Sequence, residues 1–294
     1  MRDETTGISL HDKAVHLVAA LKHNRLARIA TMPVMSLQFM RRDFSYVKSE
    51  DSARVKALAN QHAGERCFIL GNGPSLSIED LDLLKDEVTF ASNRIYKLFD
   101  KTEWRPTYYV AVDREVIAQE ADNLPGQPIG EAFINITPAS KRIEGKPHIT
   151  LINKRPKYYS SHKYTTDNIF FSREPWRCVS EGYTVTYTCF QLAFYMGFKE
   201  VYLLGMDHTY SHFVDRNGVL RVRDGVDDHC YDDPKGAVIN PQYKEGVEFA
   251  YRVALYEGED RGIRICNATR GGSLEIFERV DLESVLTKNG EGNE

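Results

Sequence analysis

The sequence predicts an α/β protein with a Rossmann-like, mostly parallel sheet, flanking helices, a helical N-terminal appendage and a lid-like loop. Two observations support this prediction. From residue 66 onward, short apolar runs alternate with helical patterns. The apolar runs are continuous rather than alternating, which is typical of strands that are buried on both faces. Helices between such strands imply right-handed crossovers, and these crossovers produce a parallel sheet.

Each of the expected elements follows from its own pattern. The expected strands are apolar runs, most of which stop at a glycine or a polar residue, at residues 67–70, 88–91, 108–112, 132–135, 149–152, 201–204 and 263–266. Apolar positions at helical spacing predict helices over residues 184–196 and 244–257. The first of these helices should end at Gly197, because glycine readily adopts the left-handed conformation of a helix C-terminus.

The chain divides into an appendage and a larger domain. Residues 1–62 read as helical and form the N-terminal appendage, and residues 63–294 form the Rossmann-like nucleotide-binding catalytic domain. Within this domain, residues 211–242 are polar, rich in Asp and Gly, and long for a connection. Long connections in compact domains are typical of lids and binding loops, so we expect a lid over this segment.

Composition narrows the class of protein. The net charge of −4 provides no global field that would recruit nucleic acid. The five cysteines contain no CxxC pair, which favours reduced thiols over a disulfide framework or a zinc cluster. The N-terminus lacks the pattern of a signal peptide, and no run approaches the roughly 18 apolar residues of a membrane-spanning helix. We therefore expect a cytoplasmic protein.

Residues 13–48 are strongly basic, with seven Lys or Arg against one acid, Asp43. Pro33 would interrupt any single helix through this stretch. One interpretation is a helical appendage that packs on the core with its charges outward. The alternative is peripheral contact with the inner face of an anionic membrane, since basic stretches with apolar residues bind such surfaces.

A glycine turn follows the first expected strand, with the sequence GNGPS at residues 71–75. A helix from Ile78 should follow, because Ser77 and Asp80 have the spacing of a capping box. Glycines let the backbone approach a phosphate, and a helix N-terminus favours an anion. The third glycine of the dinucleotide fingerprint and the Lys-Ser/Thr pair of a P-loop are both missing. The turn is therefore either a nucleotide site of another kind or an ordinary tight turn.

Polar residues stand at the ends of five expected strands, and ligands of open α/β sheets bind at the carboxyl ends of strands. These residues are Asn93, Asp113, Asn135, Asp207 and Asn267. Any one of them could instead cap a helix or a turn. Their shared position favours a polar pocket.

The motifs together resemble one superfamily, over residues 66–280. It contains the MptE-like proteins (6-hydroxymethylpterin diphosphokinase-like) and the motility accessory factors, and it resembles the bacterial sialyltransferases that use CMP-sialic acid. The motifs are GNGPSL at residues 71–76, Asn93-Arg94, Asp113, GYT at 182–184, QLA at 191–193, GFK at 197–199 and LGMDHTY at 204–210.

The resemblance implies roles for individual residues. The general base is expected to be His229, in the mobile loop, and Tyr210 and Tyr231 are expected to donate hydrogen bonds to the leaving phosphate. The residues expected to bind the nucleotide or donor are Gly71, Asn72, Gly73, Ser75, Asn93, Asp113, Gly182, Thr184 and Asp207. One departure is Glu181, which stands where the sialyltransferases have a small polar residue and so leaves the identity of the donor open.

The resemblance implies a transferase, foremost an inverting glycosyltransferase that uses a CMP-activated acidic sugar in surface glycan or glycoconjugate synthesis. Such an enzyme needs no cofactor and no metal. The alternatives are an MptE-like pyrophosphokinase that uses ATP and magnesium, and a non-catalytic nucleotide-binding protein of polysaccharide assembly. The expected partners are a nucleotide-activated donor and a glycan or glycoconjugate acceptor. Nucleic acid is not expected, and a homo-oligomer stays open.

Overall fold

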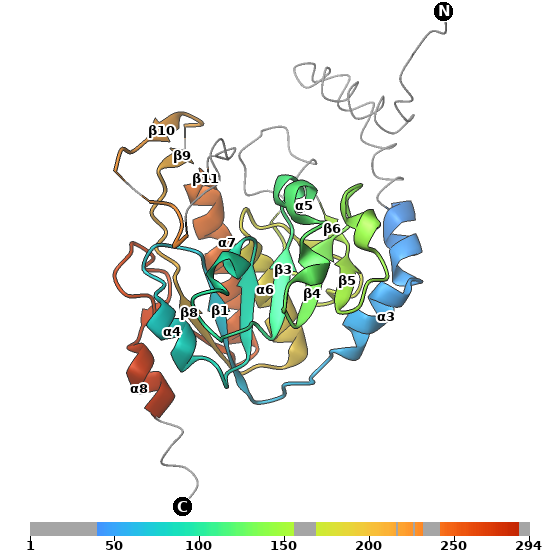
Figure 1. Ribbon diagram of the computed structural model, residues 1–294, viewed down its shortest axis with the longest axis horizontal. Helices are drawn as coiled ribbons and strands as arrows, with labels where there is room; N and C mark the ends of the chain where they lie inside the picture. The colour runs from blue at the N-terminus through green and yellow to red at the C-terminus, as the bar shows by residue number, and fades with distance from the viewer. Residues whose placement is uncertain (1–39, 156–168, 216, 226, 232–241, 288–294) are drawn as a thin grey trace, which may run out of the picture.

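The computed structural model describes residues 40–155, 169–215, 217–225, 227–231 and 242–287. Its centre is an eight-stranded sheet with helices on both faces (Figure 1). The strand order is β13-β12-β8-β1-β2-β3-β4-β5, and every neighbouring pair is parallel. The strands are β1 (Arg66–Leu70), β2 (Thr89–Ser92), β3 (Tyr108–Ala111), β4 (Glu131–Asn135), β5 (Ile149–Ile152), β8 (Glu200–Leu204), β12 (Arg264–Asn267) and β13 (Glu278–Arg279). The predicted fold class is confirmed.

Helices connect these strands and cover the sheet. The α-helices are α3 (Glu50–Ala57), α4 (Ile78–Leu83), α5 (Arg114–Glu120), α6 (Val185–Met196), α7 (Lys244–Asp260) and α8 (Leu282–Thr287). Short 3-10 turns are η2 (Ile95–Leu98), η3 (Leu124–Gly126) and η4 (Ser140–Ile143). The capping box predicted for α4 is present, and α6 ends at Gly197 in a left-handed conformation, as expected.

The core has two halves, one on each face of the sheet. Successive side chains of a strand point to opposite faces, so a strand that is covered on both sides is mostly apolar along its whole length. In β1, Ile69 packs in the cluster that holds α6 and α7, whereas Phe68 packs in the cluster that holds α4, α5 and α8. This double burial explains why the strands read as continuous apolar runs.

The sheet changes direction between β1 and β8. From β1 the chain adds β2, β3, β4 and β5 on one side, and it then returns to add β8 and β12 on the other side. The carboxyl ends of β1 and β8 therefore lie side by side, with Leu70 opposite Leu204. A point of this kind is where open α/β sheets bind their ligands.

The segment predicted as a lid contains more regular structure than the sequence indicated. Its polar composition predicted a loop, but β9 (His212–Val214), β10 (Leu220–Val222) and β11 (Gln242–Tyr243) form a separate three-stranded sheet. These strands have only two or three residues each, too few for an alternating pattern to stand out. The sequence also missed the short pair of β6 (Lys154–Arg155) and β7 (Val179–Ser180).

The described part of the N-terminal appendage packs against the edge of the sheet. Residues 40–47 are helical, and α3 lies beside β5. Val55 of α3 is fully buried, and the Ser52 hydroxyl donates to the Trp176 carbonyl oxygen at 2.6 Å. Residues 1–39, which hold most of the basic stretch, lie outside the described residues. The division into 1–62 and 63–294 stays a prediction.

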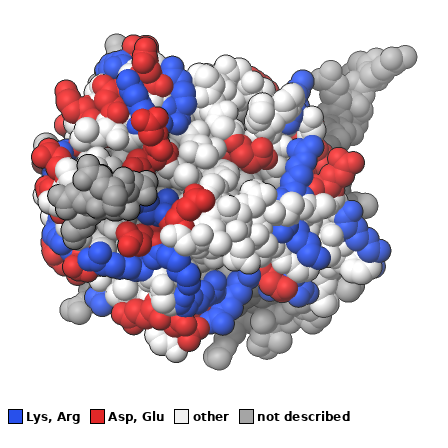
Figure 2. All heavy atoms as spheres, turned by 90° about the horizontal axis from the view of Figure 1, so that it is seen from below, with Lys and Arg blue, Asp and Glu red and all other residues white. Residues whose placement is uncertain are grey.

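The surface shows both signs of charge. On the face seen in Figure 2, Lys and Arg side chains lie next to Asp and Glu side chains, and neither sign covers the face alone. This mixture agrees with the small net charge of −4. Among the described residues, we find no helix whose length and apolar character would let it cross a membrane.

Gln191 of α6 forms hydrogen bonds with the backbone of the segment that precedes this helix. Its fully buried amide accepts from the backbone N–H groups of Ser172, at 3.1 Å, and Ser180, at 2.8 Å. The same amide donates to the carbonyl oxygens of Ser180, at 3.0 Å, and Tyr187, at 2.8 Å. One side chain thus satisfies four backbone groups that have no access to water.

Replacing Gln191 with Leu should strand the backbone groups of Ser172 and Ser180, whereas the Tyr187 carbonyl oxygen keeps its partner within α6. Because an unsatisfied buried polar group costs about 1–3 kcal/mol, we expect Gln191→Leu to lower the free energy of unfolding by about 3 kcal/mol or more. The control is Leu192→Met on the same helix, a volume-conserving change that should cost less than about 1.5 kcal/mol. Urea denaturation measures both values, and equal stability of the two variants would contradict this role of Gln191.

Candidate active site

A cavity of about 630 Å³ opens at the carboxyl ends of β1, β2 and β8. Its volume is in the range of small-molecule sites. Of the residues predicted for catalysis or binding, the structure brings most into its wall: Gly71, Asn72, Gly73, Asn93, Asp113, Thr184, Asp207, Tyr210, His229 and Tyr231. Ser75 and Gly182 do not line the wall. Ser75 instead contacts Asp207, which lines the cavity, and Gly182 packs against the Tyr187 ring.

The glycine turn is pressed against the turn that follows β8. The Gly73 backbone N–H donates to the Gly205 carbonyl oxygen at 3.0 Å. A Cβ atom at Gly71 would stand 2.3 Å from that same oxygen, and a Cβ atom at Gly73 would stand 2.0 Å from Asp207 Oδ2. No side chain fits at either position, so this close approach explains both glycines of the motif.

Asp207 joins the two turns. Its Oδ2 atom accepts from the Ser75 hydroxyl at 2.7 Å and from the Ser75 backbone N–H at 3.3 Å. Ser75 was expected to bind the donor, but its hydroxyl is engaged by this carboxylate behind the cavity wall. Its position is therefore a supporting one.

Two amide oxygens in the wall are buried and have no hydrogen-bond partner in the described part of the chain, Asn72 Oδ1 and Asn93 Oδ1. The Asn72 amide nitrogen donates to the Ser92 carbonyl oxygen at 3.1 Å, which fixes the orientation of that side chain. Asn93 has a positive φ of 54°, a conformation that asparagine tolerates better than most residues. A buried acceptor without a donor is costly, so these oxygens favour a ligand that donates N–H or O–H groups.

The other polar residues at strand ends have mixed outcomes. Asp113 lines the cavity, but one oxygen caps α5 by accepting from the backbone N–H groups of Glu115 and Val116. Asn135 and Asn267 do not line the cavity, which corrects the expectation that all five residues form one polar pocket. Asn135 bridges neighbouring strands, and Asn267 holds the turn after β12, each through both ends of its amide.

The N-terminus of α6 faces the cavity through Thr184, which caps the helix. A helix N-terminus carries partial positive charge and favours an anion. Gly182, just before it, has a positive φ of 53°, and a Cβ atom there would meet the Tyr187 ring at 2.2 Å. Gly182 therefore shapes the turn that aims the helix.

Two basic side chains in the wall escaped the sequence prediction. Lys154 Nζ lies 3.4 Å from Glu181 Oε1, and both residues line the cavity. Arg94 lines it too and pairs with Glu120, with Nε and Oε1 2.7 Å apart. Lys154 lies in the short strand β6, which had no signal in the sequence. Arg94 did follow Asn93 in a recognised motif, and that context could have identified it.

The lid is attached to the glycine turn. The Cys230 backbone N–H donates to the Asn72 carbonyl oxygen at 2.7 Å, which brings the neighbouring His229 into the wall of the cavity. The His229 and Tyr231 rings are stacked, with centroids 5.0 Å apart and planes 5° from parallel. The carboxylate of Asp228, which directly precedes His229, accepts from the Ser211 backbone N–H at 2.6 Å and from the Ser211 hydroxyl.

Tyr210 lies between β8 and the lid, beside His208. Its hydroxyl is 3.1 Å from His208 Nδ1. Burial raises the pKa of Tyr210 well above its usual value, so the phenol keeps its proton at any physiological pH. Glu248 of α7 completes this group, with Oε1 at 3.2 Å from His208 Nε2. The sequence did not identify Glu248 as a site residue, because an acid four residues after Lys244 on a helix is typical of a surface ion pair.

Among the residues that the structure describes, no three or more His, Cys, Asp or Glu side chains are grouped as metal ligands.

Comparison with known proteins completes the description of the site. The family described as 6-hydroxymethylpterin diphosphokinase MptE-like matches residues 42–213, more than half of the chain. The chain belongs to the MptE-like family. The predicted membership is thus confirmed, and the match places the chain among transferases at a coarse level. No curated protein matches the sequence.

A similar solved structure is that of the MAf glycosyltransferase from Magnetospirillum magneticum AMB-1. The two chains are 16% identical, and the TM-score is 0.46. The match covers 82% of this chain and 39% of the other, so this chain spans about two fifths of the length of that protein.

The close approach of the two turns can be tested at Gly73. Because a Cβ atom there meets both a carboxylate and a backbone oxygen, we expect Gly73→Ala to destabilise the protein by about 1–3 kcal/mol and to abolish ligand binding in the cavity. Gly126→Ala is the matched control, since a Cβ atom there has no neighbour within 4 Å among the described residues. Thermal denaturation of both variants checks the prediction, and an unchanged Tm for Gly73→Ala would contradict it.

Proposed function

We propose that this MptE-like protein is a nucleotide-dependent transferase that moves a glycosyl group with inversion. The donor is a CMP-activated acidic sugar, and the acceptor is a hydroxyl group of a glycan or glycoconjugate. The observation that carries the nucleotide part of the proposal is the pair of buried, unpartnered amide oxygens of Asn72 and Asn93. A nucleoside offers what they lack, in its ribose hydroxyls and in the amine of its base.

The wall of the cavity supplies the groups that the transfer needs. In this proposal His229 removes the proton from the acceptor hydroxyl as its oxygen bonds to the anomeric carbon. The bond from that carbon to the phosphate oxygen breaks, and the nucleoside monophosphate leaves with the bonding electron pair. Tyr210 and Tyr231 donate hydrogen bonds to the leaving phosphate, and the N-terminus of α6 adds positive potential. No divalent metal takes part in this scheme.

The basic side chains in the wall support an anionic donor. Lys154 is held in place by Glu181, and Arg94 is held by Glu120. Both cations are mostly shielded from water, where their attraction for a phosphate or a carboxylate is stronger than at the surface. Glu181 stands at the sequence position where the sialyltransferases have a small polar residue. In this protein it pairs with Lys154.

The description of the family favours a second candidate, transfer of a diphosphoryl group from ATP. The two candidates differ in their nucleotide and in their need for magnesium. Thermal stabilisation by CMP, CDP and ATP, each with and without magnesium, separates them, because a ligand at a hundred times its Kd adds about 2.7 kcal/mol. Stabilisation by ATP only in the presence of magnesium would replace the glycosyl-transfer proposal. Binding of a nucleotide without turnover of any donor would favour the non-catalytic alternative.

The unpartnered amide of Asn93 provides a direct test of nucleotide binding. Asn93→Gly keeps the left-handed backbone, which glycine adopts freely, and removes only the amide. We expect the Kd for CMP to rise by about ten- to a hundredfold, which corresponds to the loss of one or two hydrogen bonds. Isothermal titration calorimetry measures this change.

Asn60→Gly is the matched control for this experiment, because Asn60 also has a positive φ, of 56°, and is exposed and outside the cavity wall. Equal affinity of the Asn93→Gly variant and the wild type would remove the amide from the binding site.

The catalytic roles can be tested by separating turnover from binding. His229→Ala should lower kcat by about a hundred- to ten-thousand-fold, the span typical of losing a general base, and should change nucleotide affinity little. Tyr210→Phe should lower kcat by about a hundredfold, because it removes a donor to developing charge. The control is His148→Asn, since His148 is exposed and has a positive φ of 59° that asparagine tolerates. Near-normal turnover of His229→Ala with a true acceptor would contradict its role.

We also propose that residues 13–48 bring the enzyme to an anionic membrane or a lipid-linked acceptor. In the described part of this stretch, the large apolar side chains of Met40 and Phe44 are exposed, as contact with a membrane surface requires.

A further inference from the structure

Three side chains form a hydrogen-bonded series from the cavity into α7: Tyr210, His208 and Glu248. His208 is the central member, and its side chain is only 2% exposed. Its Nδ1 atom lies 3.1 Å from the Tyr210 hydroxyl, and its Nε2 atom lies 3.2 Å from Glu248 Oε1. Both ring nitrogens of this buried histidine are therefore occupied by the protein.

The chemistry of the partners fixes the proton positions. An ionised carboxylate can only accept, so His208 Nε2 must carry a hydrogen that it donates to Glu248. Burial lowers the pKa of His208, and the hydrogen bond that the ring donates to Glu248 opposes this effect without cancelling it, so the ring is neutral near pH 7. A neutral ring with a proton on Nε2 has a bare Nδ1, which accepts the hydroxyl proton of Tyr210.

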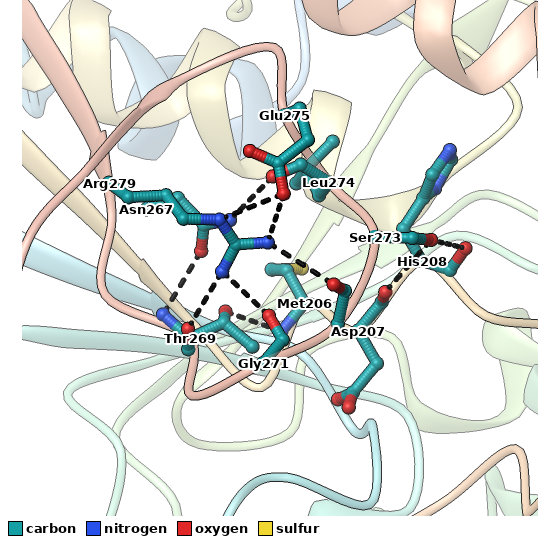
Figure 3. Close-up of polar contacts among 11 residues, drawn as sticks. Met206, Asp207, His208, Asn267, Thr269, Gly271, Ser273, Leu274, Glu275 and Arg279 are labelled. Atoms are coloured by element: carbon teal, nitrogen blue, oxygen red, sulfur yellow. Dashed lines mark hydrogen bonds and ion pairs between the residues drawn. The ribbon is translucent and has the colours of Figure 1, made fainter.

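Hydrogen bonds from a neighbouring loop hold the turn that contains His208. His208 has a positive φ of 54°, a left-handed conformation that histidine adopts more readily than most residues. Ser273 fixes the turn, because its backbone N–H donates to the Asp207 carbonyl oxygen at 2.7 Å and its hydroxyl donates to the His208 carbonyl oxygen at 2.9 Å. Arg279 holds the loop that contains Ser273, because it donates to the Gly271 carbonyl oxygen at 2.6 Å (Figure 3).

This arrangement creates a conflict with the role proposed for Tyr210. As long as its proton is donated to His208, the Tyr210 oxygen can only accept a hydrogen bond from the cavity. A leaving phosphate has acceptor oxygens alone and needs a donor. The conflict disappears when His208 carries a proton on both nitrogens, because Nδ1 then donates to the Tyr210 oxygen and frees the hydroxyl proton for the phosphate.

We propose that His208 and Glu248 are positioning residues that convert Tyr210 from an acceptor into a donor when an anionic phosphate binds. His208 takes up one proton from solvent on Nδ1, the Tyr210 hydroxyl turns toward the phosphate, and Glu248 balances the new imidazolium charge. When the phosphate leaves, His208 returns the proton to solvent. This inference rests on the proposed function, since it requires a phosphate beside Tyr210.

The charged groups around His208 set the pH range. From α7, Glu248 favours the protonated ring and Lys244 opposes it, while Tyr251 of the same helix packs against the ring. On the side of the lid, the negative charge of Asp228 adds to the rise that burial causes in the pKa of Tyr210. A bound phosphate adds negative charge and raises the pKa of His208 from its lowered value. Proton uptake therefore peaks between the two pKa values, and affinity for the phosphate ligand rises as pH falls through the higher one and levels off below the lower one.

Calorimetry tests the uptake directly. CMP is titrated into the full chain near pH 7 in buffers of different ionisation enthalpy, and the slope of the observed enthalpy gives the number of protons taken up. We expect a fraction of a proton, on the order of one half, for the wild type. His208→Asn, which tolerates the left-handed backbone, should remove the part of the uptake that belongs to His208 and leave only the proton exchange of the CMP phosphate, whose own second pKa is about 6. Glu248→Gln should reduce the contribution of His208 in part. Persistence of full uptake in His208→Asn would overturn the inference.

Two other histidines in the cavity wall provide the comparison, since His212→Asn and His229→Asn should both retain the uptake. Loss of uptake in either of them in place of His208→Asn would assign the proton to that histidine and overturn the inference.

NMR of the free protein, with nitrogen-15 in its histidines, separates this inference from the proposed function. We expect His208 to be neutral near pH 7 with its proton on Nε2, and we expect Glu248→Gln to weaken that preference. A proton on Nδ1 in the free wild-type protein would overturn the inference, whichever nucleotide binds. If CMP, CDP and ATP all fail to bind, the proposed function is lost, and the inference that depends on it is lost with it, even where the tautomer is as expected.

Discussion

The contact between the glycine turn after β1 and the turn after β8 is the constraint on which the rest of the site depends. Two parallel strands end beside each other, and their following turns lie so close that no Cβ atom fits at Gly71 or Gly73. The Asp207 carboxylate closes this contact by holding Ser75. Because the Asn72 carbonyl oxygen then faces the lid and accepts from Cys230, the same contact also determines where His229 lies. Binding groups and the candidate base are thus positioned by one piece of backbone geometry.

The parts of this structure that the sequence predicts are those determined locally. Strands buried on both faces are mostly apolar along their whole length, so they can be recognised in the sequence without knowledge of their neighbours. The glycine turn is visible because only glycine allows the backbone approach that it makes. The capping box of α4 and the glycine that ends α6 depend on residues three to five positions apart, and both occur where the sequence places them.

The parts that the sequence does not predict depend on pairing between distant segments. Asn93 and Asn135 look alike as polar residues after apolar runs. Asn93 lines the cavity, and its amide oxygen has no partner among the described residues, whereas both ends of the Asn135 amide bridge strands. Lys154 enters the wall from a two-residue strand, and Glu248 reaches His208 from a helix 40 residues away in the sequence. Residue type restricts what such side chains can do, but only the fold determines which of them meet.

The two histidines that matter most in this site differ in the way that their proposed tasks require. A base that accepts a proton from a variable acceptor has to meet that acceptor, and His229 stands on the lid beside the aromatic ring of Tyr231. A histidine that sets the direction of one hydroxyl bond has instead to be rigid, buried and occupied at both nitrogens, as His208 is. The acceptor side and the leaving-group side of the reaction would then depend on different histidines, one on the lid and one beside the sheet. Such a separation lets the enzyme hold a base ready at the acceptor while the donor proton for the phosphate arrives only with the phosphate itself.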